Sequence, residues 1–218
     1  MGPWSRNVHE LLGTLRRAGI TEVPEVLGTT ADGRERLSFI EGVVGHYPLP
    51  HWLWSDSSLE SAARLLRRIH DASVIHVQTR EGWRGAAREP VEVICHNDFA
   101  PYNLVFRDGA VVGVIDFDMA APGPRLWDLA YLAYRLVPFV EDAAAPPSIR
   151  DAEDARLGAL LTAYGTDAPA ERLWEVMAAR LDALAEHTRG ETARRPELLG
   201  HALMYERDAA RLRARSGA

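Results

Sequence analysis

The sequence contains no lysine, and all 25 of its basic residues are arginine. A lysine that pairs with nucleotide phosphates is therefore excluded, and a coding bias toward GC-rich codons is the simplest explanation of the absence. There is a single cysteine, Cys95, so an internal disulfide is excluded as well. Because Cys95 lies in an apolar run, we expect a buried thiol rather than a nucleophile.

Long apolar runs and an excess of positive charge are also lacking. No run approaches the roughly 20 residues that span a bilayer, and the N-terminus shows no basic-then-apolar targeting signal. The net charge of −6 disfavours binding to a nucleic-acid backbone, which needs a basic face. We therefore expect a cytoplasmic protein with no membrane or nucleic-acid partner. Its 218 residues, 47% of them hydrophobic, are enough to bury a core.

Two short segments hold the side chains best suited to chemistry. Residues 96–103 read His-Asn-Asp-Phe-Ala-Pro-Tyr-Asn, and residues 114–118 read Val-Ile-Asp-Phe-Asp. They supply one carboxylate that can act as a base, Asp98, and an amide and a second carboxylate that can share a cation, Asn103 and Asp116. Phosphoryl transfer needs this combination, because the attacking hydroxyl must be oriented and Mg²⁺ must neutralise charge on the phosphate oxygens.

The local pattern predicts how these groups are brought together. The apolar run 103–106 and the return run 111–115 flank Arg-Asp-Gly-Ala, in which Asp-Gly is a strong hairpin signal. Such a hairpin places Asn103, at the start of one strand, close to Asp116, at the end of the other. Oxygen ligands of this kind suit Mg²⁺.

A surface hairpin with polar ends is the plain alternative, because Asp and Asn favour loops and turns wherever they occur. For Asp98 or Asn103 alone, that alternative is the better interpretation. The whole set, placed where apolar strands end, favours a functional site.

With these two segments, the sequence resembles the aminoglycoside phosphotransferase and choline kinase family. The resemblance rests on His96, Asp98 and Asn103 with the Ile-Asp-Phe-Asp stretch that follows, and further matching segments lie at residues 37–42, 65–72 and 127–130. It covers nearly the whole chain to about Phe139. It implies an α+β, protein kinase-like fold with a mostly helical C-terminal lobe, a catalytic β-hairpin and an incomplete N-terminal lobe.

The resemblance also implies a role for each matching residue. Asp98 matches the catalytic base, and Asn103 and Asp116 match the Mg²⁺ ligands. The first residue of the motif supports the loop without transferring protons, and a later aspartate ties the catalytic loop through hydrogen bonds. The hinge, whose backbone would meet the adenine of ATP, is matched by three consecutive residues. These supporting and hinge residues are His96, Asp128, Phe39, Ile40 and Glu41, and Asp118, where protein kinases have a glycine, is a further candidate.

The N-terminal part departs from the family pattern. Met1 is followed almost at once by a helical pattern with Val8, Leu11, Leu12 and Leu15 on one face, and no glycine-rich phosphate loop precedes it. We therefore expect an N-terminally truncated member, with residues 1–41 as the remnant of the N-terminal lobe and residues 42–218 as the catalytic and substrate lobe. Because that apolar face and the open edge of the short N-terminal sheet lack their family partners, we expect a homodimer or a poorly soluble monomer.

The rest of the chain is expected to be helical. Ser57 with Glu60 forms a capping box that predicts the start of one helix. Further helices are expected at about residues 126–137, 151–164, 169–187 and 196–213, with an Ala- and Pro-rich connection at 141–148. Acidic residues of this tail could line a pocket for a cationic substrate, although acids on helix surfaces are normally just solvated. They are Glu153, Asp154, Glu171, Glu175, Asp182 and Glu186.

Three functions are compatible with the sequence. The first is an ATP- and Mg²⁺-dependent phosphotransferase that acts on a hydroxyl of a small molecule, such as an aminoglycoside or an amino alcohol. The second is a nucleotide- or metabolite-binding remnant of that family without turnover. The third is a metal-dependent hydrolase that uses His96 with the nearby carboxylates. It ranks last, because such enzymes usually need several histidine ligands and this set has one.

Overall fold

The computed structural model describes residues 2–139 and 145–216, and the first half of the expected connection at 141–148 lies outside the described residues. The helices are α1 (Ser5–Arg17), α2 (Asp56–Ser73), α3 (Arg125–Leu136), α4 (Pro147–Arg150), α5 (Glu153–Tyr164), α6 (Ala170–Glu191) and α7 (Leu199–Ser216). The strands are β1 (Val26–Thr29), β2 (Glu35–Leu37), β3 (Val43–Val44), β4 (Val93–Cys95), β5 (Leu104–Arg107), β6 (Ala110–Val114) and β7 (Ala121–Gly123).

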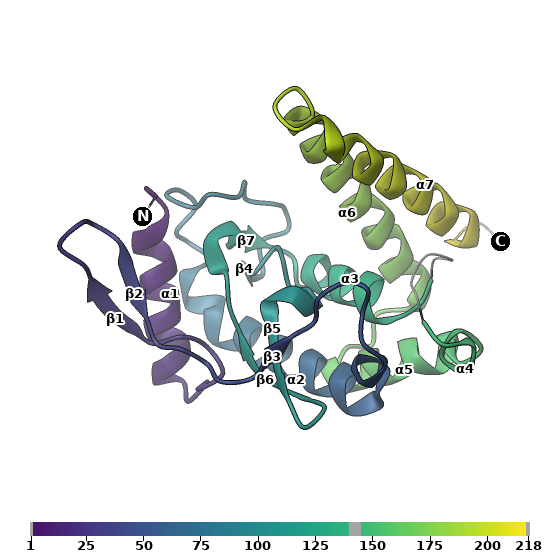
Figure 1. Cartoon of the computed structure of the whole chain (residues 1–218), viewed down its shortest axis with the longest axis horizontal. Coiled ribbons are helices and arrows are strands. Elements are labelled where there is room, and N and C mark those ends of the chain that lie inside the picture. The colour runs from purple at the N-terminus through teal and green to yellow at the C-terminus, as the bar shows by residue number, and fades with distance from the viewer. Residues whose placement is uncertain (1, 140–144, 217–218) are drawn as a thin grey trace.

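The described strands form three small antiparallel sheets rather than one large one. Strands β1 and β2 pair near the N-terminus, β3 adds to the β5–β6 hairpin, and β4 pairs with β7. Figure 1 shows α1 and the β1–β2 hairpin at one end of the molecule, the other two sheets beside α2 in the middle, and the α6–α7 hairpin projecting at the far end. The predicted α+β class, with a helical C-terminal part, is confirmed.

The β5–β6 hairpin forms where the sequence predicts it. Its two-residue turn is Asp108-Gly109, and both residues have positive φ angles, of 51° and 76°. Two positive φ angles give the backbone twist that joins antiparallel strands without splaying them, and Asp-Gly adopts them readily. The pairing of Leu104 with Val114 continues beyond the ladder as a hydrogen bond of 2.9 Å from the Ile115 amide to the Asn103 carbonyl. The base of the hairpin therefore holds the chain just before Asp116 against Asn103.

Helix α1 corrects one expectation. The prediction that Val8, Leu11, Leu12 and Leu15 form an uncovered apolar face is wrong, because all four are buried in the main hydrophobic core. Helix α1 packs against α2, β1 and the short 3₁₀ turn at residues 117–119. This face therefore no longer supports the homodimer, which stays a prediction, as does the domain boundary after Glu41.

The C-terminal helices build the remaining wall of the core. Helix α3 is buried along most of its length, and α6 packs against both α3 and α7. The buried residues of α3 include Asp128 in its first turn, which places a carboxylate inside the protein next to the end of β4. None of the described helices is both long and apolar enough to cross a membrane.

Candidate active site

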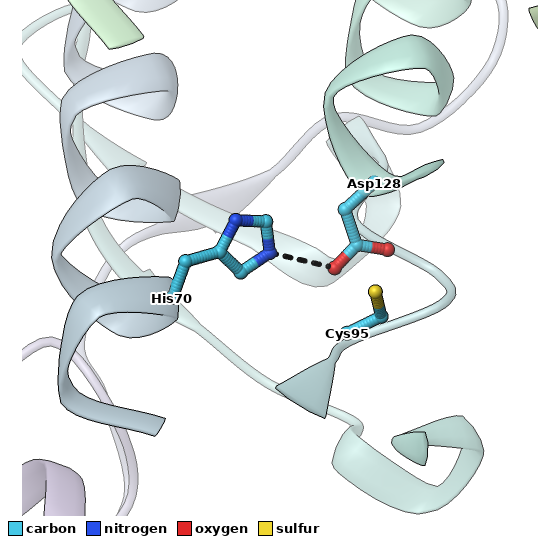
Figure 2. Close-up of side chains that lie close together, drawn as sticks. All are labelled: His70, Cys95 and Asp128. Atoms are coloured by element: carbon cyan, nitrogen blue, oxygen red, sulfur yellow. Dashed lines mark hydrogen bonds and ion pairs between the residues drawn. The ribbon is translucent and has the colours of Figure 1, made fainter. Parts of the chain in front are cut away.

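The catalytic segment begins where β4 ends, and a buried carboxylate holds its backbone. Asp128 accepts hydrogen bonds from the backbone amides of His96, at 2.5 Å, and Asn97, at 2.9 Å. His70 on α2 lies 3.2 Å from the same carboxylate through its Nε2, and Figure 2 shows the two side chains facing each other across the helices. The aspartate therefore connects α2, α3 and the start of the catalytic loop.

The charge on Asp128 is compensated by these partners. Burial by itself disfavours the charged carboxylate, but the hydrogen bond from His70 and nearby positive charges outweigh it and hold the pKa of Asp128 below its usual value. His70 in turn has its Nδ1 2.7 Å from the hydroxyl of Tyr164 on α5. Both nitrogens of this buried histidine thus have partners.

Cys95 lies beside this pair and completes a group of three side chains that approach one another closely enough to hold a cation (Figure 2). The donor set does not fit one. Asp128 and His70 are already committed to hydrogen bonds, and the Cys95 thiol donates to the Pro124 carbonyl at 3.3 Å. Burial and the charge of Asp128 raise the pKa of the Cys95 thiol well above its usual value, so the thiolate that a metal requires is disfavoured. The cluster is a buried support for the loop.

His96 is locked into the same support. Its Nε2 lies 3.0 Å from the Ile115 carbonyl, and its Nδ1 accepts a hydrogen bond of 3.2 Å from the Asp98 amide. The ring packs against Phe117 with centroids 4.6 Å apart. Because both ring nitrogens are occupied, His96 is not available as a metal ligand, which disfavours the hydrolase alternative.

Asp98 is half-buried, and both of its carboxylate oxygens receive a hydrogen bond. Tyr102 donates to Oδ1 at 2.6 Å, and the amide nitrogen of Asn103 donates to Oδ2 at 2.8 Å. Each oxygen keeps a lone pair that can accept a further proton. Asp98 also lines a cavity of about 470 Å³ that lies between the catalytic loop and α6. It is thus a fixed, accessible carboxylate that faces a space of substrate size.

Asn103 and Asp116 fit a cation in their chemistry. The Asn103 nitrogen donates to both the carbonyl and the carboxylate of Asp98, which fixes the amide orientation and leaves its oxygen without a hydrogen bond among the described residues. Asp116 is exposed at the base of the hairpin, in a left-handed backbone conformation with φ 62°. Carboxylate and amide oxygens are the ligands that Mg²⁺ takes from proteins. Asp118 differs, because Arg84 pairs with it at 3.4 Å.

The three residues matched to the hinge lie over the β5–β6 hairpin. Ile40 fills the space above Gly113, where an added Cβ would come within 2.6 Å of it. The Glu41 carbonyl accepts a hydrogen bond of 2.7 Å from Arg107, and the Phe39 side chain is 86% exposed. The Glu41 end of this segment is therefore held by a hydrogen bond, whereas the Phe39 end is exposed.

Sequence reasoning missed the polar groups behind Asp98. The hydroxyls of Tyr102 and Tyr131 lie 3.1 Å apart, and Arg135 donates to Tyr131 at 2.6 Å and to Tyr205 at 3.1 Å. Arg180 of α6 donates to the Asn97 carbonyl. The one signal in the sequence was Tyr102 itself, which is a polar aromatic residue inside the catalytic segment.

A protein-family model matches this part of the chain. Residues 78–174 match the sequence model of the Phosphotransferase enzyme family, a stretch that contains both motif segments and Asp128. Among curated proteins, the trifolitoxin immunity protein of Rhizobium leguminosarum bv. trifolii is 41% identical over 128 residues. That match covers 56% of this chain and 48% of the relative, so the chain spans about half the length of that protein.

Solved structures extend the similarity to the whole fold. An ethanolamine kinase of Plasmodium vivax superposes with a TM-score of 0.67 at 12% identity, covering 96% of this chain and 71% of that one. A spectinomycin phosphotransferase, solved in complex with ADP and spectinomycin, superposes with a TM-score of 0.55 at 11% identity, covering 94% and 80%. The predicted kinase-like fold is confirmed, and the family match at residues 78–174 agrees with the predicted relationship to phosphotransferase enzymes.

Proposed function

Because residues 78–174 match the sequence model of the Phosphotransferase enzyme family, we propose that this chain transfers the γ-phosphate of ATP to a hydroxyl of a small molecule. The observation that carries the proposal is the geometry of Asp98. This carboxylate is held by Tyr102 and Asn103 and faces the cavity of about 470 Å³. A carboxylate so placed can accept the proton of a substrate hydroxyl as the oxygen attacks phosphorus.

The residues around Asp98 would each have a different role in the reaction. Asn103 restrains the Asp98 carboxylate with its nitrogen and leaves its amide oxygen for a cation, and Asp116 supplies a second oxygen ligand. Mg²⁺ held there would neutralise charge on the phosphate oxygens of the nucleotide. Asp128 and His70 keep the loop backbone fixed, so that the base is oriented before the substrate arrives.

Two observations support nucleotide binding. The spectinomycin phosphotransferase with the same fold was solved with ADP. In this chain, residues 39–41 match the hinge of the family and lie over the β5–β6 hairpin. We propose that their backbone meets the adenine. The cytoplasmic location predicted from the sequence stays a prediction.

The proposal is tested by ADP release over a panel of hydroxyl compounds, with nucleotide binding measured separately by calorimetry in the presence of Mg²⁺. Asp98→Asn should remove most turnover and leave nucleotide affinity nearly unchanged, because the base acts on the acceptor. Asp116→Asn should reduce both, because it removes a charge that holds the cation.

The chain offers a matched control in Asp108→Asn. Asp108 lies at the tip of the same hairpin, also has a positive φ angle, and is exposed. This variant should behave as the wild type in both measurements. Turnover undiminished by Asp98→Asn would contradict the assignment of the base. Nucleotide binding without ADP release from any acceptor would favour the alternative of a binding protein without turnover.

Protection against a toxin is a second candidate, favoured by the 41% identity to the trifolitoxin immunity protein. It is compatible with the first if the toxin is the molecule that is modified. The test is to express the chain and its Asp98→Asn variant in a strain sensitive to trifolitoxin. Survival with the wild type alone supports both functions together, survival with both proteins supports protection without catalysis, and survival with neither contradicts this candidate.

A further inference from the structure

The cavity in front of Asp98 is lined by positive charge. Three arginines and one histidine border it, whereas Asp98 is its only acidic lining residue among those described. The basic residues are Arg84, Arg88, Arg180 and His187. Of these, Arg84 is neutralised by its ion pair with Asp118. Arg88 and Arg180 therefore determine what the cavity attracts.

Arg180 is a buried residue of the cavity lining rather than a surface side chain. It is 7% exposed, and its guanidinium lies 5.1 Å from the ring centroid of Trp127 and 4.7 Å from that of Tyr131. One of its terminal nitrogens donates to the Asn97 carbonyl next to Asp98. Its Nε is buried and has no hydrogen-bond partner. A buried charge with an unused donor is costly, and a ligand can relieve that cost.

Arg88 brings a second charge to the same aromatic ring. Its guanidinium lies 3.9 Å from the centroid of Trp127, the ring that Arg180 also contacts. Partial burial and the charge of Arg180 lower the pKa of Arg88, while Glu186 acts in the opposite direction. No described residue forms an ion pair with Arg88. Two like charges close to one ring repel each other, and an anion bound beside them would offset that repulsion.

The acids of the C-terminal helices do not border this cavity, although the charge of Glu186 acts on Arg88. Asp182 pairs with Arg213, Glu175 with Arg172 and Glu153 with Arg215. None of the tail acids expected from the sequence to line a pocket borders this cavity, whereas Glu175 lines a separate cavity of about 430 Å³ beside Trp127.

We propose that the acceptor for phosphoryl transfer carries a carboxylate or another small anionic group, which binds to Arg88 and Arg180 while its hydroxyl faces Asp98. The inference rests on the proposed function and names the substrate class for the same site. It predicts discrimination against cationic acceptors such as aminoglycosides and amino alcohols, because an ammonium group in this cavity would meet two guanidinium groups. Arginine also suits a carboxylate, which it can bind through two parallel hydrogen bonds.

The test compares acceptors that differ only in charge. Glucuronate, glucose and glucosamine form one series, and glycerate, glycerol and serinol form another. Their binding is followed by NMR through the Nε–H resonances of Arg88 and Arg180, assigned with the matching substitutions. We expect the anionic member of a series to bind about tenfold more tightly than the cationic member. Equal or tighter binding of the cations overturns the proposal, and so does the absence of any response to the anions.

Arg88→Gln is the decisive variant, because Arg88 is exposed and its replacement leaves the core intact. It should weaken anion binding about tenfold and abolish the charge preference. Arg64→Gln is the matched control, because this exposed arginine of α2 pairs with Glu60 and does not border the cavity. It should change nothing.

A phosphate of the nucleotide is the other possible source of the anion, and calorimetry with ADP and Mg²⁺ separates the two. Unchanged ADP affinity in Arg88→Gln supports an acceptor anion, whereas a tenfold loss assigns the cavity to the nucleotide and overturns the proposal. The titrations need no turnover. If they show the anion preference but no acceptor releases ADP, the proposed function fails and the assignment of the cavity as an anion site stands.

Discussion

The hydroxyl of Tyr102 donates a hydrogen bond of 2.6 Å to Oδ1 of Asp98, so the proposed base is held from within its own loop. Burial, together with the neighbouring Tyr131 and Asp98, raises the pKa of Tyr102 far above its usual value, and Tyr102 therefore remains a donor. Behind it, Tyr131 receives a hydrogen bond from Arg135. A line of hydrogen bonds thus leads from a guanidinium to the base.

Tyr102→Phe should lower kcat about tenfold and leave the KM for ATP unchanged, because it releases Asp98 from one of its two restraints without touching the nucleotide side. Steady-state kinetics with the best acceptor of the panel measures both constants. Tyr47→Phe is the control, because the half-exposed Tyr47 accepts from Arg135 at 3.4 Å and its ring lies beside Tyr102, but its hydroxyl is not one of the two donors to Asp98. A rise in the KM for ATP with unchanged kcat in Tyr102→Phe would show that Tyr102 does not position the base.

Asp128 should make part of the stability depend on pH. Its folded pKa lies below the unfolded value of about 3.9. Its contribution is therefore fully present above that value and is lost as the pH falls through the lower folded pKa. Asp128→Asn should remove this part of the dependence. It should also lower the free energy of unfolding at pH 7 by about 3 kcal/mol, because one member of a buried, hydrogen-bonded pair is lost.

Urea unfolding between pH 7 and acidic pH measures this effect. Asp108→Asn, at the exposed tip of the hairpin, should leave the free energy of unfolding within about 0.5 kcal/mol of the wild-type value. The role assigned to Asp128 is wrong if its replacement by asparagine is equally harmless at pH 7.

The sequence predicted the parts of the fold that depend on neighbouring residues. Asp108-Gly109 specified the hairpin turn, because few other pairs adopt two positive φ angles. The start of α2 was placed two residues late. The side chain that caps the helix is Ser55, which accepts from the Ser58 amide at 3.2 Å, rather than Ser57. Several serines and an aspartate stand together there, and which one caps depends on where the preceding 3₁₀ turn ends.

Several of the contacts behind the site join residues that are distant in the sequence. His70 and Asp128 are 58 positions apart, and Arg135 and Tyr205 are 70 positions apart. No periodicity or turn signal reports on such pairs, because they exist only after the helices pack. The same reason explains the error on α1. Its apolar face was read correctly, but the helix and the 3₁₀ turn that cover it come from distant parts of the chain.

Cys95 should be inert in the folded protein. The thiol is buried and has a raised pKa, and only the thiolate reacts rapidly with disulfide reagents. We expect no reaction with Ellman's reagent on the timescale of minutes under native conditions and one thiol per chain after unfolding in urea. Addition of ATP and Mg²⁺ should not change the native result. Rapid native labelling would mean that the strand β4 opens readily, and the loop that carries Asp98 would then lack a rigid support.

Arg156 should contribute strongly to stability from a position far from the chemistry. This residue of α5 is 3% exposed, and it donates to the Trp54 carbonyl at 2.8 Å and to the Leu136 carbonyl at 3.1 Å. It thereby joins α5 to the segment before α2 and to the end of α3. Arg156→Ala leaves both acceptors without this donor, which should lower the free energy of unfolding by about 2–4 kcal/mol.

Arg172→Ala is the control for this substitution, because Arg172 is an exposed arginine of α6 whose ion pair with Glu175 is also exposed. It should change the free energy of unfolding by less than about 1 kcal/mol. Urea unfolding at pH 7 compares the two variants. A similar small effect for both would mean that water satisfies the two carbonyls once Arg156 is removed. A large effect of Arg156→Ala alone would show that a buried arginine fixes how α5 packs against the core beside α3.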